Sequence, residues 1–215
     1  TATPIPRSVA MTVFGDLTVS TLAQLPAGRA DVTTTVVDAT RRSAWVERAW
    51  ERVAEEVAQG RQAFVVAPHI GGGKEADGLG VVELAARLSE GPLAGVRVGV
   101  LHGRLPAEEK AAVMGAFAAG EVDVLVATTI IEVGVDVPNA TMMIIWDADR
   151  FGISQLHQLR GRIGRGGLPG VCLLVSSAEP EAPSWERLAA IAGTRDGFAL
   201  AELDLAQRRE GDVLG

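Results

Sequence analysis

The chain has 215 residues, enough for one medium-sized domain with a small appendage and a substantial hydrophobic core. Hydrophobic residues make up 47% of it and charged residues 22%, as in an ordinary globular protein, and no apolar run is long enough to predict a membrane span. A single cysteine, Cys172, excludes an internal disulfide and favours a reducing, cytoplasmic location. The net charge of −7 argues mildly against a general nucleic-acid binder.

Six short runs of β-branched and apolar residues predict β-strands. They lack polar alternation, which is typical of strands that are covered on both faces of a mostly parallel sheet. The runs are residues 33–37, 63–68, 96–100, 122–127, 141–146 and 171–175.

Helical patterns lie between these runs. Residues 42–59 carry one apolar stripe and are followed by Gly60, whereas residues 107–119 begin after Pro106 and end before Gly120. Strands and helices that alternate in this way predict an α/β fold with a doubly wound, mostly parallel sheet. Ligands of such folds bind at the carboxyl ends of the strands, so we expect the site there.

The predicted sheet domain spans residues 31–178. Residues 1–30 are rich in turns and are read as a separate linking segment. Residues 179–215 begin with a Glu/Pro cluster that predicts a linker, and helical stretches at 184–192 and 198–208 predict a small helical hairpin behind it.

The glycine-rich stretch at residues 71–78 imitates a phosphate-binding loop. A true P-loop needs a first glycine five residues before its Gly-Lys pair and a Ser or Thr after the lysine. Here Pro68 takes the first position and Glu75 follows Lys74, so we interpret the stretch as a surface loop. No other segment supplies a P-loop, and the chain is therefore predicted not to hydrolyse ATP alone.

Residues 150–166 contain four arginines and no acidic residue in a chain that is otherwise acidic. Arginines spaced by glycines suit close contact with a polyanion, because guanidinium groups bind phosphate oxygens in pairs and glycine lets the backbone approach. A solvated basic helix end is the alternative. Gly161, Gly164 and Gly166 weaken that alternative, because glycine is unfavourable in a helix and a solvated face would not need it.

The stretch Gln155-Leu-His157-Gln158-Leu-Arg160-Gly161-Arg162-Ile-Gly164-Arg165-Gly166 resembles motif VI of superfamily 2 helicases. Four other segments resemble further parts of these proteins in the right order. They are residues 1–7 (motif III), 101–110 (the segment after motif IV), 127–140 (motif V) and 196–215 (the start of the RecG translocation hairpin).

Among these helicases, the chain most resembles the RecG family. Transcription-repair coupling factors share motifs III, V and VI, but they usually show Gly-His-Gly-Gln where this chain has His102-Gly103-Arg104. The resemblance implies a RecA-like fold of the P-loop NTPase type, in the version of the second helicase domain that has no P-loop of its own. A small C-terminal helical hairpin would follow it.

The resemblance also implies which residues face the nucleotide. Arg162 and Arg165 match the two motif VI arginines that act as arginine fingers on ATP held by the first motor domain, and Gln158 matches the glutamine that positions this strip. Gly134 and Asp136 match motif V positions near the nucleotide. For Asp136, a turn cap ahead of the following proline is the alternative.

Other matched residues fall on the DNA side. Thr128 and Thr129 end a predicted strand and would donate to a DNA phosphate, although simple β-propensity explains them equally well. His102 and Arg104 lie after another strand and are expected to touch DNA, although His102 has the alternative of a hydrogen bond within its loop.

Three residues are implied to couple the ATP state to DNA movement, namely Thr1 and Thr3 of motif III and Arg208 of the hairpin. The tail departs from the family, which usually shows Arg-Gly-Pro-Gly where this chain has Arg208-Arg209-Glu210-Gly211. The chain also stops before the Thr-Arg-Gln segment that completes the hairpin. The translocating role of the hairpin is therefore in doubt in this chain.

The implied parent protein is a monomeric, cytoplasmic ATP-dependent DNA helicase that remodels branched DNA such as stalled forks and Holliday junctions. ATP and Mg²⁺ would be held mainly by the first RecA-like domain, a wedge domain would join it on the DNA, and no metal ion would bind to this chain. An inert DNA-binding or regulatory module and the equivalent domain of a transcription-repair coupling factor are the alternatives. A nicotinamide-binding Rossmann domain is excluded, since no Gly-x-Gly-x-x-Gly follows the first strand.

Overall fold

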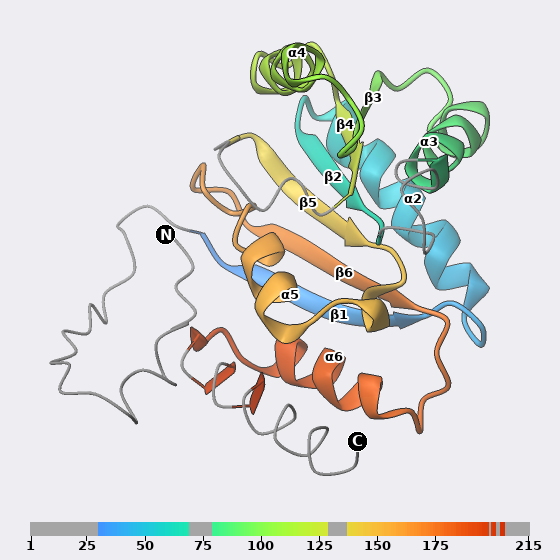
Figure 1. Ribbon diagram of the computed structural model, residues 1–215, viewed down its shortest axis with the longest axis vertical. Coiled ribbons are helices and arrows are strands. Elements are labelled where there is room, and N and C mark those ends of the chain that lie inside the picture. Colours follow the sequence, from blue (N-terminus) through green and yellow to red (C-terminus); the bar gives the residue numbers. More distant parts are fainter. Residues whose placement is uncertain (1–29, 69–78, 129–136, 198, 201–202, 205–215) are drawn as a thin grey trace, which may run out of the picture.

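The computed structural model describes residues 30–68, 79–128, 137–197, 199–200 and 203–204. Six parallel strands form one sheet with the order β1-β6-β5-β2-β4-β3 (Figure 1). All six predicted strands are confirmed, with ends that shift by no more than two residues. The strands are β1 (Val32–Asp38), β2 (Gln62–Val66), β3 (Val98–Leu101), β4 (Val124–Ala127), β5 (Ala140–Ile145) and β6 (Gly170–Ser176).

Helices cover both faces of the sheet, as the apolar strands require. Two helices pack on one face and three on the other, so the doubly wound α/β architecture is confirmed. The first pair is α2 (Ser43–Ala58) and α3 (Leu79–Glu90), and the second set is α4 (Ala107–Ala118), α5 (Ile153–Arg160) and α6 (Pro183–Gly193). None of the helices in the described ranges is long and apolar enough to cross a membrane.

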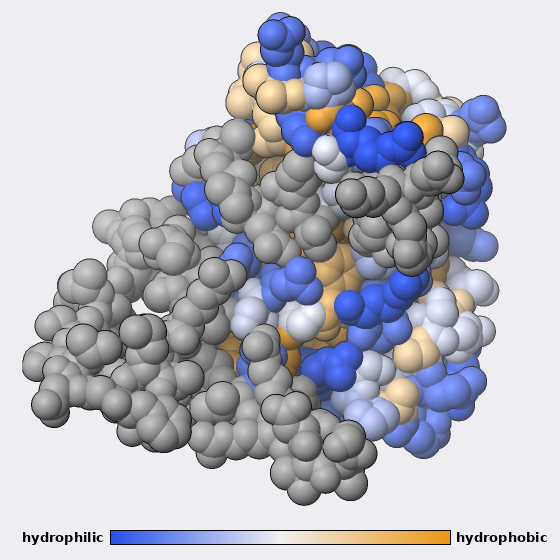
Figure 2. Space-filling view, viewed as in Figure 1, coloured by the Kyte–Doolittle hydropathy of each residue, from blue (hydrophilic) through white to orange (hydrophobic). Residues whose placement is uncertain are grey.

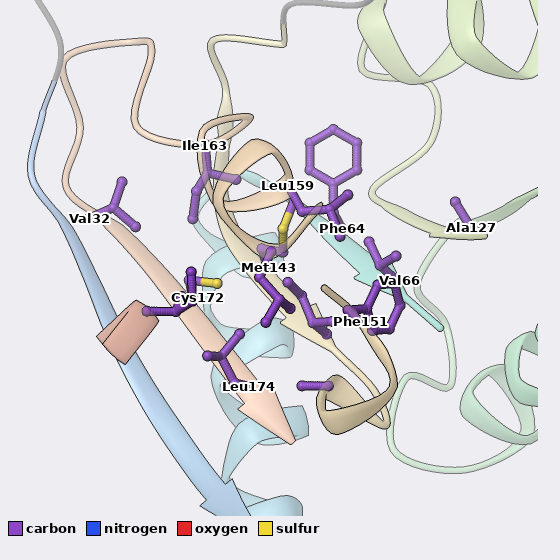
Figure 3. Close-up of a cluster of buried hydrophobic side chains, with 14 of the residues drawn as sticks. Val32, Phe64, Val66, Ala127, Met143, Phe151, Leu159, Ile163, Cys172 and Leu174 are labelled. Atoms are coloured by element: carbon purple, nitrogen blue, oxygen red, sulfur yellow. The ribbon is translucent and has the colours of Figure 1, made fainter. Parts of the chain in front are cut away.

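The larger core cluster lies beneath α4, α5 and α6. Leu159 at the end of α5 and Ile163 just after it are fully buried against the sheet, near Met143 and Cys172 (Figure 3). Burial raises the pKa of the Cys172 thiol to about 12, and the nearby charge of Arg160 opposes this only in part. The thiol is therefore protonated at neutral pH, as is typical of an inert cysteine in a protein core.

The second core cluster lies beneath α2 and α3. Trp50 of α2 stacks on Trp146 with ring centroids 5.8 Å apart, and Val53 is fully buried in the same cluster. The opposite side of α2 carries exposed ion pairs such as that of Arg48 with Glu55. On the face shown in Figure 2, hydrophilic residues predominate along the right-hand edge of the molecule, where α2 and α3 lie. This division matches the apolar stripe read from the sequence.

Helix α6 packs into the domain core rather than projecting away from it. Leu188 and Ile191 are fully buried in the cluster that also holds the inner residues of α5, and Leu200 joins them. The first helix of the predicted hairpin is thereby seen as α6. Most of the second one, predicted at 198–208, lies outside the described residues.

A buried carboxylate links α2 to the amino ends of the strands. Glu56 accepts hydrogen bonds from the Thr141 hydroxyl (2.6 Å) and from Arg61 (2.9 Å), and its other oxygen pairs with Arg52 at 2.6 Å. Burial by itself would raise the pKa of Glu56. The hydrogen bonds and the two arginines outweigh burial, so the pKa lies below its ordinary value.

We expect Glu56→Gln to lower the free energy of unfolding at pH 7 by about 1–3 kcal/mol, because buried donors lose a charged acceptor. Since the folded-state pKa is lowered, the wild-type advantage is full above the unfolded pKa and is lost as the pH falls through the folded pKa. Urea denaturation of the wild type and of Glu56→Gln across this acidic range measures the difference in the free energy of unfolding. The exposed Glu51→Gln is the control, with an expected change of about 0.5 kcal/mol or less. Equal stability of Glu56→Gln and wild type at pH 7 would contradict the assignment.

Candidate functional site

The arginine-rich segment consists of α5 and the loop of residues 161–169 that leads into β6. Ile153, Leu156 and Leu159 form the apolar side of α5 and press it onto the sheet. The first turn of α5 is closed by the Gln155 side chain, whose oxygen accepts a hydrogen bond from the backbone N–H of Gly152 (3.2 Å). Helix α5 thus has a fixed place and a fixed rotation on the sheet.

The loop after α5 is clamped at Gly164. The backbone N–H of Ala30 donates to the Gly164 carbonyl oxygen (3.0 Å), and Gly164 has a φ of +74°, which favours glycine. A Cβ at this position would lie 2.8 Å from Cγ2 of Val32. The loop is therefore held against the segment that enters β1.

A second close approach occurs at Gly166. A Cβ at Gly166 would lie 2.3 Å from the carbonyl oxygen of Pro138, so only glycine fits there. Pro138 belongs to the segment that resembles motif V (residues 127–140), of which the structure describes residues 127–128 and 137–140. The motif VI loop and the end of motif V are consequently in direct contact.

The three residues of this segment that are predicted to face the nucleotide are all accessible to solvent in part. Gln158, Arg162 and Arg165 are each partly exposed, and the residues between them include the buried Leu159 and Ile163. Nε of Arg165 donates to the Gly161 carbonyl oxygen (3.0 Å), which restricts the direction of its side chain. The segment therefore presents two guanidinium groups on a rigid backbone.

One group of candidate residues lies away from the end of the sheet where the site is expected, and its role stays a prediction. Polar ligand contacts were expected at the carboxyl ends of the strands, but the loop with Arg162 and Arg165 precedes β6 and lies at its amino end. The reason is the direction of α5, which runs back across the sheet from the carboxyl end of β5. The residues that follow this helix in the chain therefore lie at the amino ends of the strands.

The expectation does hold for the DNA-facing candidates on β3 and β4. His102 follows β3 and Thr128 follows β4, and the two positions are joined because the Thr128 N–H donates to the Leu101 carbonyl oxygen (3.1 Å). Thr128 is buried, while Nδ1 of His102 is buried without a hydrogen-bond partner in the described part of the chain. Arg104 lies exposed in the following loop.

Six predicted site residues lie outside the described residues, so their roles stay predictions. They are Thr1, Thr3, Thr129, Gly134, Asp136 and Arg208.

Sequence reasoning did not single out Asp147, which lies two residues beyond the carboxyl end of β5. Its φ of +49° is left-handed, which is uncommon for a residue other than glycine, although Asp tolerates it better than most. Burial, and then the charge of Asp149, raises the pKa of its carboxyl group, while Arg150 opposes the shift. Only the position of an Asp shortly after a buried strand could have signalled this residue.

The comparisons with known proteins agree with this geometry. The family model described as the helicase conserved C-terminal domain matches residues 47–167, from α2 through the motif VI loop. The chain belongs to this family. The match covers the arginine loop and both strands of the DNA-facing group, and it confirms the helicase interpretation of the sequence motifs.

The similarity of this helicase domain to RecG covers its whole length. It is 60% identical to the ATP-dependent DNA helicase RecG of Mycobacterium tuberculosis (strain H37Rv), over 100% of this chain and 30% of that protein. A solved structure of RecG bound to a three-way DNA junction has 42% identity and a TM-score of 0.73, and the match covers 94% of this chain and 26% of that one. The predicted resemblance to RecG is confirmed.

A more distant likeness supports the fold alone. The C-terminal domain of the DEAD-box protein Dbp5 matches with 18% identity and a TM-score of 0.51, over 78% of this chain and 86% of that one. The RecA-like architecture is thus confirmed. The chain spans about 30% of the length of the RecG proteins that it matches.

We expect Gly166→Ala to destabilise the domain by about 1–3 kcal/mol, because the added methyl group must displace the Pro138 backbone. Denaturation midpoints of the purified chain measure the change. The control is Gly115→Ala in α4, where a Cβ meets open space and alanine should be neutral or stabilising by up to about 1 kcal/mol. Equal effects of the two substitutions would show that the contact with Pro138 is not tight.

Proposed function

We propose that this chain is the second motor domain of an ATP-dependent DNA helicase that remodels branched DNA. The observation that carries the proposal is the pair Arg162 and Arg165, partly exposed on a loop whose backbone is fixed at Gly164 and Gly166. Two preplaced guanidinium groups suit the stabilisation of negative charge on a phosphoryl group during its transfer. The match to RecG over the whole chain supports the same assignment.

ATP would lie between this domain and a first RecA-like domain. The chain has no P-loop, so the other domain would hold the phosphates and Mg²⁺. In the described ranges, no group of three His, Cys, Asp or Glu residues could hold a metal ion. Arg162 and Arg165 would reach the terminal phosphate, Gln158 would position them, and Gly134 and Asp136 would approach the nucleotide.

DNA would lie along the other edge of the sheet, at the carboxyl ends of β3 and β4. His102 and the exposed Arg104 would meet the DNA backbone there, with Thr128 and Thr129 beside them. Support comes from the solved RecG relative, which is bound to a three-way DNA junction. Thr1, Thr3 and Arg208 would couple the two sites. A wedge domain in the same monomeric, cytoplasmic protein would read the branch point.

In a protein that contains both motor domains, Arg162→Ala and Arg165→Ala should each lower kcat strongly and change ATP affinity little. An arginine finger contributes about 10³–10⁵ in rate in well-studied phosphoryl transfer, and sharing between two arginines makes each single loss smaller. Lysine should restore little activity, because an ammonium group lacks the planar fork. Steady-state ATPase with saturating branched DNA measures kcat, alongside nucleotide affinity.

Arg150→Ala is the matched control for these two variants. Arg150 is an exposed arginine that precedes α5, at the start of the basic stretch of residues 150–166. Its loss should leave kcat near normal. Near-normal kcat in both Arg162→Ala and Arg165→Ala would instead favour an inert DNA-binding module.

The chain by itself should show no DNA-stimulated ATPase, because it has arginine fingers without a P-loop. Its DNA binding should be weak and should fall steeply with salt, since the basic strip is short and the net charge is −7. Phosphate release and titration of labelled DNA at two salt concentrations measure the two properties. Phosphate release above that of an Arg162→Ala preparation, or tight binding insensitive to salt, would argue against the proposal.

A further inference from the structure

Arg160 is a buried cation in the last turn of α5. The residue is 4% exposed, and its guanidinium group donates to the carbonyl oxygens of Ile191 (2.5 Å) and Thr194 (2.8 Å). Its other terminal nitrogen donates to Nδ1 of His157 at 2.9 Å, because a guanidinium group has no acceptor. Ile191 and Thr194 mark the end of α6.

The carbonyl groups in the last turn of a helix have no partners within the helix, and the helix dipole there favours a positive charge. The Arg160 side chain supplies both a donor and a charge to the end of α6. Burying a guanidinium group is costly unless its hydrogen bonds are satisfied, and an apolar side chain would fill the same space without that requirement. What the arginine adds is a rigid fork with a defined direction.

The turn that carries Arg160 is also the turn on which the arginine loop begins. The Arg162 N–H donates to the Leu159 carbonyl oxygen (2.9 Å), and the Ile163 N–H to that of Arg160 (3.4 Å). The backbone that carries Arg162 is thus built directly on the turn that Arg160 anchors. A displacement of Arg160 would move this backbone with it.

We propose that Arg160 is a positioning residue for Arg162 and Arg165, and that the end of α6 is the fixed point against which it holds them. Arg160 does not reach the phosphate itself. It acts through the turn that follows it, so α6 belongs to the framework of the ATPase site. The inference rests on the proposed function of the two arginines.

The test replaces Arg160 with Met in a protein that contains both motor domains. Methionine keeps an apolar stem of similar length and removes the fork. We expect kcat to fall about tenfold to a hundredfold, because displacements near 1 Å cost rates of this order, while the KM for ATP stays within about twofold. Arg160→Lys, which keeps the charge and some donors, should recover part of kcat.

The matched control is Arg187→Met. Arg187 also links α6 to the rest of the domain by donating to a backbone carbonyl, that of Asp149 (2.8 Å), but nearer the start of α6 and away from the loop. Its kcat should be normal. Hydrogen exchange without nucleotide gives an independent readout, in which the amides of residues 161–165 exchange faster in Arg160→Met and unchanged in Arg187→Met.

The outcomes separate the inference from the proposed function. Normal kcat and normal exchange in Arg160→Met, beside a low kcat in Arg162→Ala, would overturn the positioning role alone. Normal kcat in Arg162→Ala as well would overturn the proposed function. An equal loss of kcat in Arg187→Met would show that Arg160 contributes only to the general stability of the domain. If Arg160→Met does not fold, Arg160→Lys decides, and a folded lysine variant with wild-type kcat and exchange would overturn the inference.

Discussion

The backbone contacts of the loop between α5 and β6 leave no room for side chains at two points. Gly164 lies against the segment entering β1, and Gly166 lies against the carbonyl of Pro138. These contacts join three parts of the chain that are far apart in sequence. They place Arg162 and Arg165 on a backbone that cannot move without moving its neighbours, which is the condition for a cation that stabilises a transition state without reorganising.

The direction of α5 explains why the candidate residues lie at two opposite ends of the strands. Helix α5 runs back across the sheet, so its arginine loop lies at the amino end of β6, while His102 and Thr128 lie at the carboxyl ends of β3 and β4. Nucleotide and DNA contacts can therefore occupy different edges of one rigid sheet. In the proposed function, this separation lets one domain respond to both ligands.

Helix α6 follows the last strand of the sheet and packs against the same core. Its apolar side enters the core through Leu188 and Ile191, and its last carbonyls are held by Arg160. The segment after the Glu/Pro cluster is thus packed as part of the domain. In the inferred arrangement, movement at the end of α6 would be transmitted to the arginine loop through the buried side chain of Arg160.

The sequence by itself determined the layered architecture, because its strands are apolar throughout and its helices carry a single apolar stripe, as in residues 42–59. The arginines and glycines of residues 150–166 also favoured a phosphate contact, and the resemblance to motif VI singled out Arg162 and Arg165, whose role stays a prediction. The bounds of helix α5 were not predicted, because its eight residues are too few to show a clear helical period.

Only the tertiary structure decided where the arginine loop lies and what Arg160 does. The end of the strands at which the loop lies depends on the direction in which α5 crosses the sheet, and no local sequence pattern encodes that direction. Arg160 resembles its neighbouring arginines in sequence, but α6, thirty residues away in the chain, covers it and supplies carbonyl acceptors. Burial by a distant segment therefore separates an anchoring arginine from two that remain accessible, and it does so through packing that local sequence does not contain.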